Sequence, residues 1–91
     1  MQVFYRRSFL NRRGHHAGAY VLADIVVEPR DPGRDTWVDA AFTVADCNRV
    51  ATLDFSANDS RELANALHKA RLLRDVMIAF TDALEAAGEA L

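Results

Sequence analysis

Hydrophobic and polar residues alternate along four stretches of the first 56 residues, at 2–10, 17–28, 36–46 and 50–55. Alternation with a period of two is typical of β-strands that bury one face. In the second stretch, the row expected to face the core consists of Ala19, Val21, Ala23, Ile25 and Val27. Short turn sequences at 11–14 and 47–49 separate neighbouring stretches, so the pattern predicts a four-stranded antiparallel meander.

The second and third stretches are separated by the segment 29–35, which contains Pro29 and Pro32. Proline has no backbone N–H, so two prolines within four residues interrupt the hydrogen-bond ladder of a sheet. The segment is therefore expected to form an exposed loop.

From residue 60 onward the apolar residues recur at spacings of three and four, which predicts one long helix. Ser56, Asp59 and Glu62 supply capping signals and negative charge at its start. The stripe expected to lie on the sheet consists of Leu63, Leu67, Ala70, Leu73, Met77, Phe80, Leu84, Ala87 and Leu91. The side chains expected to be largely buried are Val21, Ile25, Phe42 or Trp37, Leu53, Phe55, Leu67 and Phe80.

The predicted helix carries more apolar surface than one sheet can cover. At 1.5 Å per residue it would be about 45 Å long, whereas a compact chain of this length is about 30 Å across. A second stripe, available for helix packing across a two-fold axis, consists of Leu72, Val76, Ala79, Ala83 and Ala86. The sequence thus predicts an α+β (ββββα) fold with a single domain, residues 1–91, whose sheet spans 1–56 and whose helix, at 57–91, forms a homodimer interface.

The composition of the chain indicates the cellular compartment in which the protein is expected. The single cysteine, Cys47, cannot form an intrachain disulfide or a CxxC zinc site, which favours a reducing cytoplasm. Residues 1–10 lack the apolar run of a signal peptide, and no stretch approaches the roughly 20 apolar residues of a membrane span. We therefore expect a cytoplasmic protein that does not enter the membrane.

Ten of the eleven basic residues are arginine, a bias that resembles that of small proteins from actinobacteria and their bacteriophages. The sequences Leu-Asp-Phe-Ser at 53–56 and Arg-Glu-Leu-Ala-Asn-Ala-Leu at 61–67 are also similar to the strand-to-helix junction of small actinobacterial proteins that end in a long helix. This resemblance implies no activity and assigns no functional residue.

Charge is unevenly distributed along the chain. Residues 1–23 contain no acid, although the net charge is −2 and the pI is about 5.8. The candidate contacts for a protein partner or nucleic acid are Arg6, Arg7, Arg12, Arg13, His15 and His16. Arginines interleaved with aromatic residues are typical of single-strand binders, and a sheet followed by a dimerising helix resembles the plan of one class of them. The acidic pI argues against a nucleic-acid partner.

Other candidate chemistry is weaker. His15 and His16 with Cys47 or His68 have the residue types of a zinc or copper site, but neighbours on a strand point to opposite faces, so an exposed pair is expected instead. A nucleophilic Cys47 lacks a recognisable orienting residue. Asp39, Asp46 and Asp54 could bind Mg²⁺, yet polar residues are expected on the solvent face of a sheet.

These patterns predict no catalytic residue, no metal and no cofactor. The expected function is that of a small non-enzymatic dimeric protein, encoded by a phage or an accessory genome, that binds a host or partner protein. The alternative is a nucleic-acid-binding protein that uses the basic N-terminal hairpin.

Overall fold

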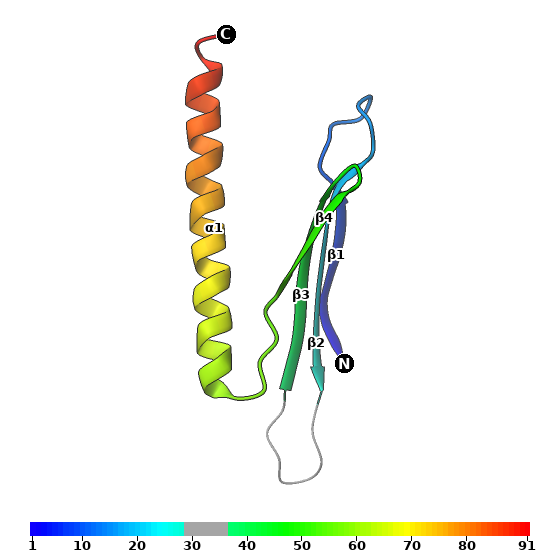
Figure 1. Ribbon diagram of the computed structural model, residues 1–91, viewed down its shortest axis with the longest axis vertical. Helices are drawn as coiled ribbons and strands as arrows, with labels where there is room; N and C mark the ends of the chain where they lie inside the picture. The colour runs from blue at the N-terminus through cyan, green and yellow to red at the C-terminus, as the bar shows by residue number, and fades with distance from the viewer. Residues whose placement is uncertain (29–36) are drawn as a thin grey trace.

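The computed structural model describes residues 1–28 and 37–91. Four strands form one antiparallel sheet in the order β1-β2-β3-β4, and a single helix follows them (Figure 1). The elements are β1 (Gln2–Phe9), β2 (Ala19–Glu28), β3 (Trp37–Asp46), β4 (Arg49–Asp54) and α1 (Ser60–Gly88). This confirms the predicted ββββα fold. The proline-containing loop predicted at 29–35 lies outside the described residues.

The strand register divides the sheet into two faces of different character, because paired residues of antiparallel strands share a face. One face, here called the apolar sheet face, carries Phe4, Val21, Ile25, Val38, Phe42, Val44 and Leu53. The opposite face is mixed and includes a hydrogen bond of 2.9 Å between the hydroxyls of Thr43 and Thr52. The apolar sheet face is thus the surface that requires a second layer.

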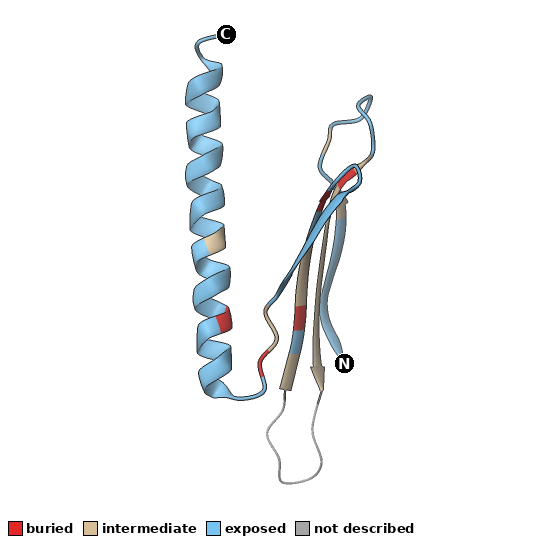
Figure 2. Ribbon diagram, in the orientation of Figure 1, coloured by how far each residue is buried: buried red, intermediate tan, exposed pale blue. Residues whose placement is uncertain are grey.

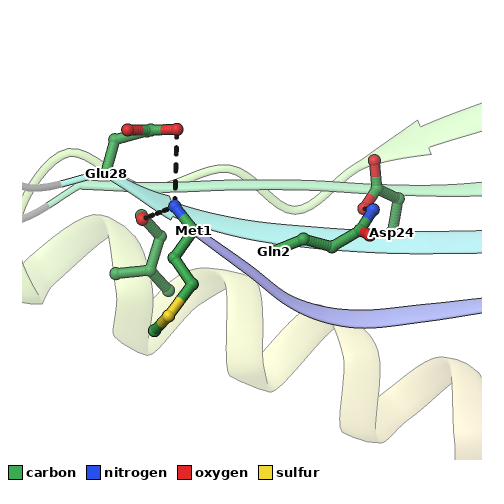
Figure 3. A network of polar contacts seen from close by, with 5 residues as sticks. Met1, Gln2, Asp24 and Glu28 are labelled. Atoms are coloured by element: carbon green, nitrogen blue, oxygen red, sulfur yellow. Dashed lines mark hydrogen bonds and ion pairs between the residues drawn. The ribbon is translucent and has the colours of Figure 1, made fainter.

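The first strand is fixed to the second at the chain's beginning. The Met1 ammonium donates a 2.7 Å hydrogen bond to the backbone oxygen of Val27 and lies 3.6 Å from the Glu28 carboxylate (Figure 3). Gln2 Nε2 donates to Asp24 Oδ1 at 2.7 Å. These contacts tie edge strand β1 to β2 beyond the regular ladder, which is interrupted by a register shift between Gln2 and Phe4.

The helix starts as its capping residues predict. The Asp59 carboxylate accepts a 2.8 Å hydrogen bond from the Glu62 backbone N–H, and the Glu62 carboxylate accepts one of 3.2 Å from the Asn58 N–H. The first bond satisfies a first-turn N–H that has no partner within the helix, and the second satisfies the N–H of the residue before the N-cap. At 1.5 Å per residue, the 29 residues of α1 extend over about 43 Å.

The predicted docking of the helix on the sheet is wrong for a single copy. Across the described strands, no Cα lies within 8 Å of a helix Cα. In the first three turns of the helix, Lys69 Nζ donates to the Asp54 backbone oxygen at 2.6 Å and lies 4.8 Å from the centre of the Phe55 ring. Ala57 pairs with Val38, so the chain after β4 extends to the beginning of β3. The helix then starts and runs beside the sheet (Figure 1).

The predicted core is wrong for the same reason. The buried residues of the described chain are all alanines, namely Ala19, Ala40, Ala45, Ala57 and Ala66 (Figure 2). Five predicted core residues, Val21, Ile25, Trp37, Phe42 and Phe55, are only half-buried. Leu53, Leu67 and Phe80 are 37%, 41% and 59% exposed. A sheet buries large side chains only when a second layer covers it, and one copy does not supply that layer.

The molecule is therefore elongated. Its extents are 60 × 25 × 19 Å and its radius of gyration is 16.8 Å, against about 12 Å for a compact chain of 91 residues. In the part of the chain that the structure describes, no helix is long and apolar enough to cross a membrane.

Candidate functional site

Nearly the whole surface of α1 is exposed: along the helix only Ala66 is buried and only Leu73 is half-buried. All five residues predicted at a dimer interface are exposed and follow one stripe of the helix: Leu72, Val76, Ala79, Ala83 and Ala86. Leu72 and Val76 are 54% and 58% exposed. We call this surface the alanine stripe. In a single copy nothing covers it over the described residues (Figure 2).

A second apolar surface follows the same helix. We call it the leucine stripe; its exposed members include Leu63, Leu67, Met77, Phe80 and Leu84. Sequence reasoning assigned this stripe to the sheet, but the structure leaves it free. The helix therefore presents two uncovered apolar stripes, and the apolar sheet face adds a third such surface.

The basic residues predicted as one contact surface divide into two groups. Arg6 and Arg7 are neighbours on β1 and so point to opposite faces of the sheet. The Arg7 guanidinium lies 5.6 Å from the centre of the Phe9 ring and 5.9 Å from that of Tyr20, a cation–π arrangement on the mixed face. The Arg7 side chain is thus positioned by two aromatic rings of its own sheet.

The remaining basic residues lie in the β1–β2 loop, where Arg12, Arg13, His15 and His16 are all exposed. Among the described residues, no carboxylate forms an ion pair with Arg12 or Arg13. The structure therefore supports a small basic loop but not the continuous basic hairpin surface predicted from the sequence.

The meander brings this loop beside the β3–β4 turn, at the same end of the sheet (Figure 1). His16 Nδ1 lies 3.8 Å from Cys47 Sγ. A ring nitrogen of His16, the Cys47 sulfur and a carboxylate oxygen of Asp46 all lie within 4.8 Å of one another. We call these residues the loop-end cluster.

Sequence reasoning considered His15 and His16 with Cys47 or His68 as ligands and set them aside because neighbours on a strand point to opposite faces. In the structure both histidines lie in the loop between β1, which ends at Phe9, and β2, which begins at Ala19. The predicted meander topology could have indicated this proximity, because it places the β1–β2 loop and the β3–β4 turn at the same end of the sheet.

The other carboxylates considered from the sequence serve a structural role. Ser56 Oγ donates to Asp39 Oδ1 at 2.9 Å, and the Ser56 N–H donates to Asp54 Oδ1 at 2.9 Å. The adjacent Ser56 side chain and the hydrogen bond from the Ser56 N–H hold the pKa of Asp54 below its usual value, and the nearby Lys69 charge acts in the same direction. These contacts fix the connection between β4 and α1, and Asp46 lies at the other end of β3.

A shallow depression of about 450 Å³ adjoins this connection, between the end of β4 and the first turns of α1. Its charged lining residues are Asp54, Asp59, Arg61, Glu62 and Lys69. Asp59 and Glu62 are already used in capping, and Lys69 is bonded to the Asp54 backbone, so the depression is accounted for by the helix start.

Comparison with known proteins adds no assignment to this geometry: no protein-family model, no curated protein and no solved structure matches the chain.

Proposed function

We propose that this chain is a small non-enzymatic interaction protein that forms a homodimer through the alanine stripe and binds a partner protein with the apolar surfaces that remain. The observation that supports the proposal is the exposure of large apolar side chains over the helix and the sheet, while the buried residues of the described chain are all alanines. A domain of this size is marginally stable even with a complete core. A second chain would supply the missing layer.

The alanine stripe suits contact between two copies of the helix. Small side chains at Ala79, Ala83 and Ala86 allow the backbones of two helices to approach closely. A contact along the helix that buries about 600 Å² per subunit would contribute on the order of 15 kcal/mol before association costs of roughly 4 to 15 kcal/mol. The estimate favours a dimer of moderate affinity.

The leucine stripe is the proposed partner-binding surface. Met77, Phe80 and Leu84 are 52%, 59% and 61% exposed and lie away from the alanine stripe around the helix. A single monomer rarely leaves an apolar surface of this extent uncovered unless it binds another molecule. We further propose that the protein acts in the cytoplasm, where its one thiol stays reduced, and that it is encoded by an actinobacterium or one of its phages, as its arginine-rich composition suggests.

The experiment compares proteins retained from an actinobacterial lysate by immobilised wild type and by Phe80→Asp. The control is Arg74→Ser, which changes an exposed polar position of the same helix. We expect a retained protein that is lost with Phe80→Asp, kept with Arg74→Ser and rebound after purification. Equal retention by all three baits would contradict the proposal.

Nucleic-acid binding is the second candidate, and the observation that favours it is that Arg12 and Arg13 of the β1–β2 loop are exposed and form no ion pair with a described carboxylate. The test is a titration of wild type and of an Arg12→Glu, Arg13→Glu variant against single- and double-stranded DNA at low and moderate salt. We expect no affinity tighter than about 10⁻⁵ M at physiological salt. Submicromolar binding that the variant lacks would replace the protein-binding proposal with this one.

A further inference from the structure

The loop-end cluster combines three different metal-ligating groups from two separate segments of the chain. His16 comes from the β1–β2 loop, whereas Asp46 ends β3 and Cys47 begins the β3–β4 turn. An imidazole nitrogen, a thiol sulfur and a carboxylate oxygen lie within 4.8 Å of one another, and all three residues are exposed. No other group of three such side chains converges in this way among the described residues.

The position of Cys47 is fixed by the backbone around it. Cys47 has a φ of 57°, a conformation that glycine or asparagine usually adopts in a two-residue turn. Its N–H donates to the Gly18 backbone oxygen at 2.8 Å. A Cβ on residue 18 would lie 3.1 Å from Cys47 Cα and 3.3 Å from Cys47 Sγ, so glycine is what lets the loop approach the turn.

His16 is held from its own loop. The Asn11 side-chain amide donates to the His16 backbone oxygen at 2.8 Å, and the Gly18 N–H donates to His16 Nδ1 at 3.3 Å. These contacts place the His16 ring beside Cys47 before any ion binds. The Gly18 hydrogen bond occupies the Nδ1 lone pair, so Nδ1 must release that bond before it can bind an ion.

We propose that His16, Asp46 and Cys47 bind one divalent cation of the zinc class, in contrast to the exposed pair expected from the sequence. Zinc binds thiolate sulfur at about 2.3 Å and imidazole nitrogen at about 2.0 to 2.1 Å, which in tetrahedral geometry separates the two ligand atoms by roughly 3.5 Å. The present separation of 3.8 Å needs only a small closure. The mixed N, O and S donor set favours zinc over magnesium or calcium, which prefer oxygen alone.

Binding would release the thiol proton to solvent and leave a fourth coordination position for water. The ion would connect the β1–β2 loop to the β3–β4 turn and so cross-link the two hairpins of the meander. A sheet without a large buried core should gain stability from such a link.

Cobalt(II) is a direct probe, because a thiolate ligand gives it a charge-transfer absorption in the near ultraviolet and tetrahedral coordination intensifies its visible bands. The reduced, metal-free protein is titrated with Co²⁺, which is then displaced by Zn²⁺. We expect one ion per chain, a thiolate charge-transfer band, loss of that band on zinc addition, and a higher thermal midpoint with zinc.

The decisive variant is Cys47→Gly, which removes the sulfur and introduces the residue that a positive φ favours, so the turn is retained. It should lose the charge-transfer band while its circular dichroism spectrum stays unchanged. His16→Ala should weaken cobalt binding at least tenfold, whereas His15→Ala, the matched control outside the cluster, should not. A wild type without the band, or a His16→Ala variant with wild-type affinity, would overturn the proposal.

Discussion

Replacing Ala83 with glutamate should separate the proposed dimer. Ala83 lies between Ala79 and Ala86, in the part of the alanine stripe that consists of small residues and where two helices could approach most closely. The substitution would place a carboxylate from each copy into that contact, and such a group is costly to remove from water without a partner. The free monomer should fold as the wild type does, because residue 83 is exposed in one copy.

The expected change in the dissociation constant follows from the free energies gained and lost at the interface. An apolar gain on the order of 15 kcal/mol against association costs of roughly 4 to 15 kcal/mol leaves a modest net affinity. A penalty of about 3 kcal/mol raises the dissociation constant by about 100-fold, since each 1.4 kcal/mol is a factor of ten. A dimer that forms at micromolar concentration would then be mostly dissociated below about 100 µM.

Sedimentation velocity over a concentration series measures this directly, with the 10.1 kDa chain as the monomer reference. Ala64→Glu is the matched control, because it makes the same substitution on the side of the helix that carries Asp75 and Asp82. We expect a wild-type and Ala64→Glu dimer and an Ala83→Glu monomer. A wild type that remains monomeric at high micromolar concentration, or an Ala83→Glu variant that dimerises normally, would refute the reasoning.

Three further predictions concern stability and charge. In the monomeric variant, Leu67→Ala should cost about 1 kcal/mol in urea unfolding, below the 2 to 5 kcal/mol of a buried leucine, because Leu67 is 41% exposed; a larger loss would show that the helix docks on the sheet. Gly18→Ala should cost about 1 to 3 kcal/mol by the same assay, because the added Cβ would crowd Cys47; an unchanged midpoint would contradict that packing. Because the pKa of Asp54 is lowered on folding, its carboxylate stabilises the fold above its unfolded-state pKa, and this contribution is lost as pH falls through the folded-state value. Ser56→Ala removes the hydroxyl but keeps the N–H bond, so it should raise the pKa of Asp54 part of the way toward its usual value in a carboxyl NMR titration, and an unchanged pKa would exclude the hydroxyl as a cause.

The elements themselves were predictable because their signals are local. Period-two alternation located each strand, and the hairpin turns determined their antiparallel order. The Asp59 and Glu62 capping pair located the helix start. Each of these signals depends on residues within a few positions of one another.

Tertiary packing was not predictable in the same way. Periodicity shows that the leucine stripe is apolar but not which surface covers it. The prediction that Leu67 and Phe80 pack on the sheet assumed that a single copy completes its own core. The loop-end cluster was considered only in part, through His16 and Cys47, and was set aside for a related reason. His16 and Cys47 are 31 positions apart, and only the pairing of β2 with β3 brings their loop and turn together.

Element lengths show why self-association remains the central prediction even if the helix can close onto the sheet. The ten residues of β2 or β3 span about 33 Å at 3.3 Å per residue, whereas α1 extends over about 43 Å. A closed helix aligned with one end of the sheet would project past the other by about 10 Å, or roughly seven residues. Since α1 follows Ala57, which pairs with Val38 at the beginning of β3, and stops at Gly88, the projecting part would include Ala83, Leu84 and Ala86. Two of the five residues of the alanine stripe, Ala83 and Ala86, would therefore project past the sheet in this arrangement, and a second copy of the helix is a surface of matching length that can cover the whole stripe.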